Sequence, residues 1–353
     1  DNKAFKMNLD WFDLWLKRDT IDKWKGSFRL DQIGDVKIPV LHVSGTWDGD
    51  GIGTKLHWET LRKSGGNQWL IFGPWEHAFN TKTQFADQNY GSTSILELDS
   101  VYLRFFDTFL KAKDVAWDEQ PRVRFFISGT NYWFKTSDWP PPMAKPRTLF
   151  LGGGNALGKK SLGRLLNAPG NAGRDLIKYD PNGRKIDDSA FEVDPGAAKT
   201  IVPVGETPDF WLLYRSDPFT VNTIVSGPVT VKLRGSSTAA SANFHVYLME
   251  EAKPGQFRII HMPGNRSTSY PDGKVLKPGE VFQVEVRPWE FAREFKKGAR
   301  LVLAVTSDSF PSFARNPGTG EPLWKATEIK KATHTILKGG SNGSSVTFYT
   351  IEM

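Results

Sequence analysis

The hydrophobic pattern changes once along this 353-residue chain, near residues 114–121, and this change limits the folds available to it. Before that point, short apolar runs alternate with helical patterns. After it, β-type runs follow one another, and no amphipathic helix longer than about two turns competes with them. Helices between strands indicate parallel pairing, whereas many strands without crossover helices are typical of a sandwich or jelly roll. We therefore expect an α/β part followed by an all-β part, and the length fits two domains.

The α/β part centres on a strand–helix–strand unit. KIPVLHVSG at 37–45 is an apolar run entered from a proline, and QWLIF at 68–72 is a second one. Between them, residues 53–64 have a helical pattern that Gly65-Gly66 would end. Short links of this kind predict a βαβ unit, in which the two strands are parallel.

Two further segments have helical periodicity. NLDWFDLWLKR at 8–18 predicts a helix with Phe12, Trp15 and Leu16 among its buried residues. ILELDSVYLRFFDTFLKA at 95–112 predicts another helix, with one wide apolar face for covering a sheet.

The all-β part contains short runs rich in β-branched and aromatic residues, with turn residues between them. Nine of them are RVRFFIS (122–128), RTLFL (147–151), WLLYR (211–215), VTVKLRG (229–235), FHVYLM (244–249), FRIIHM (257–262), VFQVEV (281–286), RLVLAV (300–305) and SVTFYTI (345–351). Runs of this number and spacing predict a β-sandwich of the jelly-roll type.

Composition narrows the classes of function. The absence of Cys excludes a disulfide scaffold, a thiolate zinc site and a Cys nucleophile. The net charge of +7 comes from scattered basic residues, so we expect no nucleic-acid partner. No apolar run approaches the roughly 18–20 residues of a membrane-spanning helix, so we expect no membrane partner. No two His residues have metal-ligand spacing, and we expect neither a metal nor another cofactor.

Two polar side chains follow the two strands of the βαβ unit. Asp48 comes after the first strand in GTWDGDG, and His77 comes after the second in GPWEH. Functional groups of open α/β sheets lie beyond the carboxyl ends of the strands, so these two should meet at one edge. A carboxylate that orients an imidazole is the acid–base half of a hydrolase triad. The order of the acid before His is also the order of α/β-hydrolases.

PVLHVSGTWDG followed by LIFGPWEH resembles the cocaine esterase / X-prolyl dipeptidyl aminopeptidase family of α/β-hydrolases. The resemblance continues through LRFFDTFLK (103–111), VRFFISGTNYWFKTSDWPPP (123–142) and FKKGARLVLAVTSDSFPSFARNPGTG (295–320). It implies Asp48 as triad acid, His77 as general base and a serine hydrolase that works through an acyl-enzyme. The implied substrates are small acyl esters, amides or dipeptide-type molecules. The implied domains are a remnant of a helical cap at 1–34, the C-terminal part of an α/β-hydrolase domain at 35–114 and a jelly roll at 120–353.

The chain departs from the family at the nucleophile. The family's nucleophilic Ser lies on a strand–turn–helix elbow well upstream of the triad acid, whereas only 47 residues precede Asp48 here. We therefore expect that the nucleophile is not in this chain, that this chain alone is inactive, and that an N-terminal hydrolase half is a partner that supplies the Ser. Assembly into a homo-oligomer stays open.

Two motif matches are interpreted as coincidences. Residues 339–343, GGSNG, fit the G-x-S-x-G nucleophile motif around Ser341, but they lie between two β-runs, and a hairpin turn explains them. Asp48, Asp50, Gly53 and Glu59 occupy positions 1, 3, 6 and 12 of a calcium-binding loop. Its fifth position is a residue without a side-chain oxygen, and the preceding element is a predicted strand, so we expect no calcium site.

Three neighbours of the pair have two interpretations each. Asp50 matches one of the acids with which the amino acid ester hydrolase branch of the family receives a substrate's ammonium group, or it is a solvated turn residue. Trp47 and Trp75 flank the pair, and each either walls an acyl pocket or packs in the core.

A second class of function remains as an alternative. A jelly roll rich in aromatic residues could serve as a non-catalytic binding module, for example for carbohydrate. That alternative gives no physical reason for the WDG…GPWEH pair, so the hydrolase is the preferred interpretation.

Overall fold

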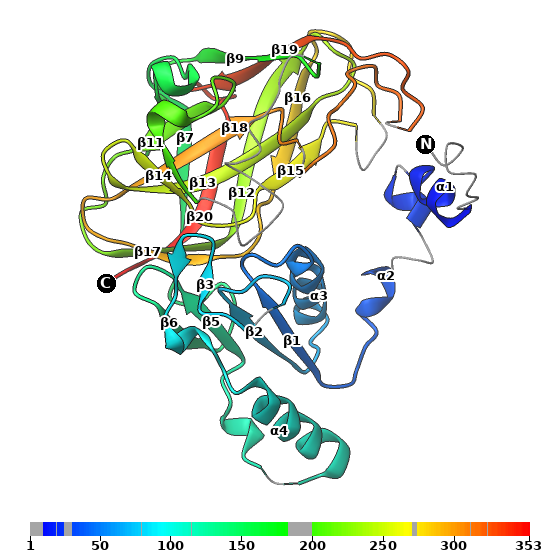
Figure 1. The fold of residues 1–353 in the computed structure, drawn as a ribbon, viewed down its shortest axis with the longest axis vertical. Coiled ribbons are helices and arrows are strands. Elements are labelled where there is room, and N and C mark those ends of the chain that lie inside the picture. The colour runs from blue at the N-terminus through cyan, green and yellow to red at the C-terminus, as the bar shows by residue number, and fades with distance from the viewer. Residues whose placement is uncertain are drawn as a thin grey trace.

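A computed structural model describes residues 10–18, 20–24, 30–78, 80–113, 115–182, 200–269, 274–310, 312–322 and 324–353. These residues form two units, which Figure 1 shows as a smaller lower part and a larger, strand-rich upper part. We call the described residues within 30–136 the α/β unit and those within 145–353 the β-rich unit. No helix in the described ranges is long and apolar enough to cross a membrane.

The sheet of the α/β unit has the strand order β1-β2-β5-β6. Its strands are β1 (Val40–Gly45), β2 (Gln68–Gly73), β5 (Val123–Ile127) and β6 (Tyr132–Thr136). β1, β2 and β5 run parallel, and β6 is antiparallel to β5. Helix α3 (Gly51–Lys63) connects β1 to β2. The predicted βαβ unit is therefore confirmed.

Strands β5 and β6 correct the sequence-based placement of residues 122–136. We expected them in a jelly roll beginning at residue 120, but their partners lie in the first sheet, where Leu70 aligns with Val123. Successive side chains of a strand point to opposite faces, and Phe125 and Phe126 are both buried. Burial on both faces is typical of a strand in a covered parallel sheet. The apolar pattern predicts this burial, but it does not specify the neighbouring strand.

Helix α4 (Leu98–Lys111) confirms the second predicted helix. Leu98 and Phe105 are buried, and Phe105 packs edge-on against Trp69 of β2. Part of the predicted apolar face is nevertheless exposed, including Phe106. The helix therefore covers the sheet along only a part of its length, and it projects from the lower end of the molecule in Figure 1.

Helix α1 (Asp10–Leu16) lies within the segment predicted as the first helix, whose residues 8 and 9 are outside the described ones. The prediction that Phe12, Trp15 and Leu16 are buried is wrong, because all three are exposed. Figure 1 shows α1 to one side of both sheets, away from either core. The Trp15 ring instead lies 5.7 Å from the ring of Trp24, so aromatic contacts here are local.

The β-rich unit is one hydrogen-bonded network of 14 strands, and its pairs are antiparallel except for β8 with β11. The path is β10-β14-β13-β18-β11-β8-β7-β20-β12-β19-β9, with β15 on β13 and with β16 and β17 on β12. This confirms an all-β second part, and the jelly-roll assignment stays a prediction. The bounds are β7 (Lys145–Gly152), β8 (Gly163–Leu166), β9 (Gly173–Tyr179), β10 (Ile201–Pro203), β11 (Leu212–Ser216), β12 (Thr223–Ser237), β13 (Asn243–Lys253), β14 (Gln256–Ile259), β15 (Gly264–Ser267), β16 (Val281–Val286), β17 (Ala292–Phe295), β18 (Arg300–Thr306), β19 (Ala332–Lys338) and β20 (Ser345–Glu352).

Short elements connect these larger ones. They are α2 (Leu30–Ile33), β3 (Gln84–Phe85), β4 (Gln88–Asn89) and the 3₁₀ turns η1 (Ile21–Trp24), η2 (Ser92–Ser94), η3 (Trp117–Glu119), η4 (Gly158–Lys160) and η6 (Val204–Glu206).

The two units share a buried contact. One apolar cluster joins Trp47 and Phe126 of the α/β unit to Trp211 and Phe257 of the β-rich unit. The backbone also crosses between the units just after β5, where the amide of Ser128 donates to the carbonyl of Ala292 at 3.0 Å. The site at the edge of the small sheet is therefore held against the large unit.

Candidate active site

The carboxyl ends of β1 and β2 lie side by side. The strands are in register up to Gly45 opposite Gly73. The contact continues beyond the strands, because the amide of Trp47 donates to the carbonyl of Trp75 at 2.9 Å. A Cβ atom on Gly45 would lie 2.2 Å from that carbonyl oxygen, so the close approach of the two loops requires glycine. The loops that carry Asp48 and His77 therefore begin in contact with each other.

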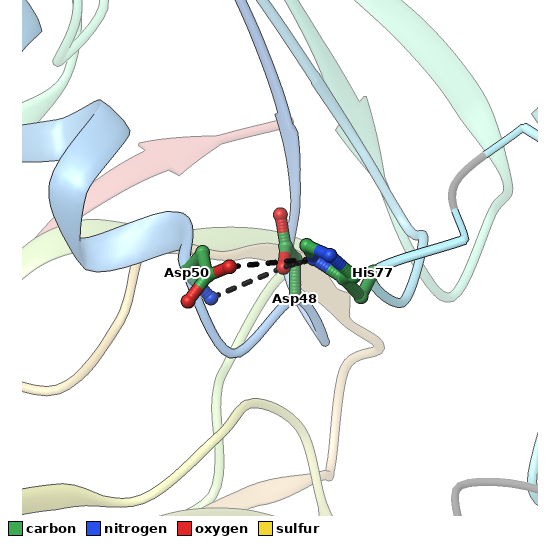
Figure 2. Close-up of side chains that lie close together, drawn as sticks. All are labelled: Asp48, Asp50 and His77. Carbon is green, nitrogen blue, oxygen red and sulfur yellow. Dashed lines mark hydrogen bonds and ion pairs between the residues drawn. The ribbon is translucent and has the colours of Figure 1, made fainter. Parts of the chain in front are cut away.

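Asp48 and His77 form a hydrogen-bonded pair at this edge (Figure 2). Nδ1 of His77 lies 3.0 Å from Oδ1 of Asp48. Asp48 is only 5% exposed, and other donors also bind its carboxylate. The Ser44 hydroxyl donates to Oδ2 at 3.0 Å, and the Asp50 amide donates to Oδ1 at 3.1 Å. A buried, multiply bonded carboxylate is a fixed anchor for the imidazole.

The charges around His77 stabilise its protonated form. Its pKa is raised above 6.5, first by the hydrogen bond to Asp48 and then by the negative charges of Asp48 and Asp50. Oδ2 of Asp50 lies 3.5 Å from Nδ1. An imidazole whose cation is stabilised in this way can accept a proton during a reaction and release it in a later step.

The other side of the imidazole is open. The His77 side chain is 78% exposed, and no hydrogen bond to its Nε2 occurs among the residues that the structure describes. A hydroxyl nucleophile would have to approach Nε2, and the exposure leaves room for it. The arrangement thus has the geometry of a carboxylate that orients an imidazole, and the roles of Asp48 as triad acid and His77 as general base stay predictions.

The structure gives Ser341 none of the context of a nucleophile elbow. It is an exposed turn residue between β19 and β20, and strand β20 follows the turn where a nucleophile elbow would need a helix. The interpretation as a hairpin is wrong in one respect. β19 and β20 flank β12 and pair with it, not with each other, so the turn crosses over a strand.

The two tryptophans beside the pair are buried. Trp47 is 6% exposed, its ring stacks on Phe85 with centroids 4.4 Å apart, and its Nε1 donates to the Tyr90 hydroxyl at 2.8 Å. Trp75 is 3% exposed and donates from Nε1 to the carbonyl of Ser94 at 2.9 Å. These contacts favour the packing interpretation, and a pocket-lining role for either ring stays a prediction.

The structure brings Asp50 to the pair but not the rest of the calcium-loop pattern. The ligand atoms of Asp48, Asp50 and His77 lie within 4.8 Å of one another, a spacing at which they could contact one cation. Glu59 lies on helix α3 and is not a member of this group. The hydrogen bond between His77 and Asp48 accounts for the arrangement without an ion, and the absence of a metal stays a prediction.

Three residues near the site were missed by reasoning from the sequence. Ser44, which holds Asp48, carries a weak signal as a polar residue near the end of an apolar strand. Trp289 lies 3.9 Å from where a Cβ of Gly49 would be, and Glu290 is paired with Lys55 of α3. Neither has a local signal, because about 240 positions of sequence separate Trp289 from Gly49.

Comparisons with known proteins agree with the resemblance noted in the sequence. Residues 115–347 match the model of the X-Pro dipeptidyl-peptidase C-terminal non-catalytic domain, and residues 3–79 match that of X-Pro dipeptidyl-peptidase (S15 family). The chain is 25% identical over 351 residues to the cocaine esterase of Rhodococcus sp. (strain MB1 Bresler). That match covers 93% of this chain and 59% of the esterase, so the chain spans well under two thirds of this relative.

Solved structures show the same fold. An aminopeptidase from the marine sediment archaeon Thaumarchaeota archaeon matches with a TM-score of 0.76 and 20% identity, over 93% of this chain and 58% of that one. An α-amino acid ester hydrolase matches with a TM-score of 0.71 and 20% identity, over 98% of this chain and 62% of that one. With the family model covering more than half of its length, the chain belongs to the cocaine esterase / X-Pro dipeptidyl-peptidase family.

Proposed function

We propose that this chain supplies the acid and the general base of a serine hydrolase that cleaves esters or amides of small acyl groups. The observation that carries the proposal is the 3.0 Å contact between Nδ1 of His77 and the buried carboxylate of Asp48. The nucleophilic Ser, in this proposal, lies outside these 353 residues, on an N-terminal hydrolase half that packs at the open side of His77.

The proposed reaction uses each group in turn. His77 accepts the proton of the Ser hydroxyl at Nε2 as the Ser attacks the acyl carbonyl, and later gives a proton to the leaving group. Asp48 keeps the proton of the imidazole on Nδ1 and stabilises the imidazolium, without itself becoming protonated. Water then attacks the acyl-enzyme, with His77 again as base.

The class of substrate is proposed from the relatives. Their names describe a cocaine esterase, an α-amino acid ester hydrolase and an aminopeptidase, so ester and amide or dipeptide-type substrates all remain in the proposal. The exposed Asp50 carboxylate would attract a substrate's ammonium group and also favours protonation of His77. The buried rings of Trp47 and Trp75 would pack beneath the two loops that carry Asp48 and His77.

Two experiments test the proposal. The chain alone, treated with a fluorophosphonate probe and with an activated ester, should show neither labelling nor turnover. Labelling of any Ser in the chain, with turnover that His77→Ala abolishes, would place the nucleophile inside it and overturn that part of the proposal. Co-expression with an N-terminal hydrolase half should produce ester hydrolysis that depends on Asp48 and His77.

A second candidate function rests on a different observation. The β-rich unit, together with Thr20 and Lys23, borders a cavity of about 550 Å³ whose lining includes Asn243, Asn316 and the aromatic residue Phe313. Amides and an aromatic ring can bind a neutral sugar, so a carbohydrate-binding role is the alternative. It predicts saturable binding on a glycan array that Asn243→Ala weakens, and the absence of such binding would count against it.

A further inference from the structure

One short loop of the β-rich unit reaches the machinery of the α/β unit with two neighbouring side chains. The loop is residues 287–291, between β16 and β17. The indole of Trp289 lies against Gly49, 3.9 Å from where that residue's Cβ would be. Gly49 is the residue directly after Asp48, so Trp289 lies beside the loop that carries the proposed triad acid.

Glu290, the next residue, reaches the helix that follows this acid. Its Oε1 lies 2.6 Å from Nζ of Lys55 on α3, and the two side chains are 6% and 4% exposed. Its Oε2 accepts a hydrogen bond from Nε1 of Trp139 at 2.9 Å. The Lys55 ammonium makes no hydrogen bond to any residue that the structure describes, so its contact with Glu290 is an ion pair only. Among the described residues, Glu290 is the carboxylate that is paired with this buried cation.

The start of α3 is connected to the Asp48 loop by backbone hydrogen bonds. The amide of Gly51, the first residue of α3, donates to the Asp48 carbonyl at 3.0 Å. The amide of Gly53 donates to the carbonyl of Asp50 at 2.9 Å. A shift of the helix would thus move the backbone that aims the Asp48 carboxylate at His77.

The loop itself is packed against the β-rich unit and hydrogen-bonded to it. The amide of Gly227 donates to the Phe291 carbonyl at 3.0 Å, and a Cβ on Gly227 would collide with the Glu290 carboxylate at 2.2 Å. The Phe291 ring is buried and stacks on His261 with centroids 4.9 Å apart. A fixed loop can therefore impose its position on the smaller unit.

We propose that Trp289 and Glu290 are positioning residues that hold the Asp48 loop and helix α3, so that the β-rich unit sets the geometry of the Asp48–His77 pair. This gives a role in the site to a region that matches a domain described as non-catalytic. The proposal depends on the proposed function only for the catalytic meaning of the pair, because the geometry can be measured without turnover.

The test is an NMR titration of the His77 imidazole in the full chain, assigned by the signal that His77→Ala removes. In the unaltered chain this imidazole should titrate above pH 6.5. Trp289→Ala should move the titration downward by a few tenths of a unit or more, because the loosened loop weakens the hydrogen bond to Asp48. Trp289→Phe, which removes the Cη2 atom nearest to Gly49 but keeps an aromatic ring, should lower the titration point by less than Trp289→Ala.

The ion pair is tested without leaving a buried charge. The double variant Lys55→Met with Glu290→Leu keeps the volume, removes both charges and should lower the titration point in the same direction. The matched control is the buried pair of Lys338 and Asp175, 2.8 Å apart and within the β-rich unit. Lys338→Met with Asp175→Asn should lower the unfolding temperature but leave the pH at which His77 titrates unchanged.

Two results would overturn the proposal. One is a His77 titration that stays at its original position in folded Trp289→Ala and in the folded Lys55/Glu290 double variant. The other is an equal shift of the His77 titration in the Lys338/Asp175 control, which would show that any loss of stability moves this titration. If hydrolysis proves independent of His77 while the titration shifts occur as expected, the proposed function fails and the positioning role stands.

Discussion

The histidines in the cores of the two units differ from the histidine at the edge of the small sheet. Four of them are buried, His42 in β1 and His245, His261 and His334 in the β-rich unit, and burial lowers the pKa of each to about 4. His77 is exposed beside two carboxylates, and its pKa is raised. The buried rings are neutral packing groups, whereas His77 is the ring whose charge can change at little structural cost. The difference supports the proposal that His77 is the general base.

The largest expected effect is acid unfolding driven by the four buried histidines. Their folded pKa values lie below the unfolded value near 6.5, so between pH 6.5 and 4 the unfolded chain binds more protons and stability falls as the pH falls. Each contributes about 1.4 kcal/mol per pH unit in this range. Urea unfolding followed from pH 7 to pH 4 measures the slope.

His245→Phe is the control for this prediction. The His245 ring lies against Phe313, and its Nδ1 is buried without a hydrogen-bond partner, so an apolar ring should fit. The slope of stability against pH should decrease by about one proton. An unchanged slope would show that His245 is not buried in its neutral form.

Next in size is Asp48→Asn in the enzyme complemented with a nucleophile-bearing half. The amide leaves the shape in place but no longer holds the imidazole in the required tautomer, and hydrolysis should fall about 10⁴-fold. In the unaltered enzyme, kcat/KM should rise with pH through a pKa above 6.5, because the base must be neutral to accept a proton. A loss of less than tenfold would contradict the assigned role.

A third prediction compares two ion pairs of different burial. Glu290→Gln leaves the buried Lys55 cation uncompensated and should lower the free energy of unfolding by about 3–5 kcal/mol. Glu76→Gln removes the partner of the exposed Lys82, 3.3 Å away, and should cost less than about 1 kcal/mol. Equal losses in urea unfolding would contradict the burial of the first pair.

The smallest effect is expected from Asp50→Asn. The Asp50 charge is a lesser cause of the raised pKa of His77, so its removal should shift the titration slightly downward. Because Asp50 is 83% exposed, added salt should produce part of the same shift in the unaltered chain and little further shift in the variant. An NMR titration at two salt concentrations measures both.

The predictable part of the molecule is the part governed by local rules. The β1–α3–β2 unit follows from apolar runs, a helical pattern and glycine stops, and parallel strands then place Asp48 beside His77. Sequence reasoning failed where the partner is distant. β5 has the pattern of a buried strand, but its sequence does not show to which sheet it belongs. Likewise, nothing in the sequence near residue 289 or 290 indicates that these residues lie beside Gly49 or Lys55. The exposure of α1 was missed for the same reason, because an amphipathic pattern does not specify what covers it.

The pairing of β5 with β2 has a consequence for how such chains can be recombined. The match to the non-catalytic domain begins at residue 115, yet the two strands just after that point complete the sheet of the α/β unit. A crossover at residue 115 would therefore replace half of the strands that support the reactive edge. The boundary of the matched segment thus differs from the boundary of the sheet, and an exchange that preserves the edge would have to fall after β6.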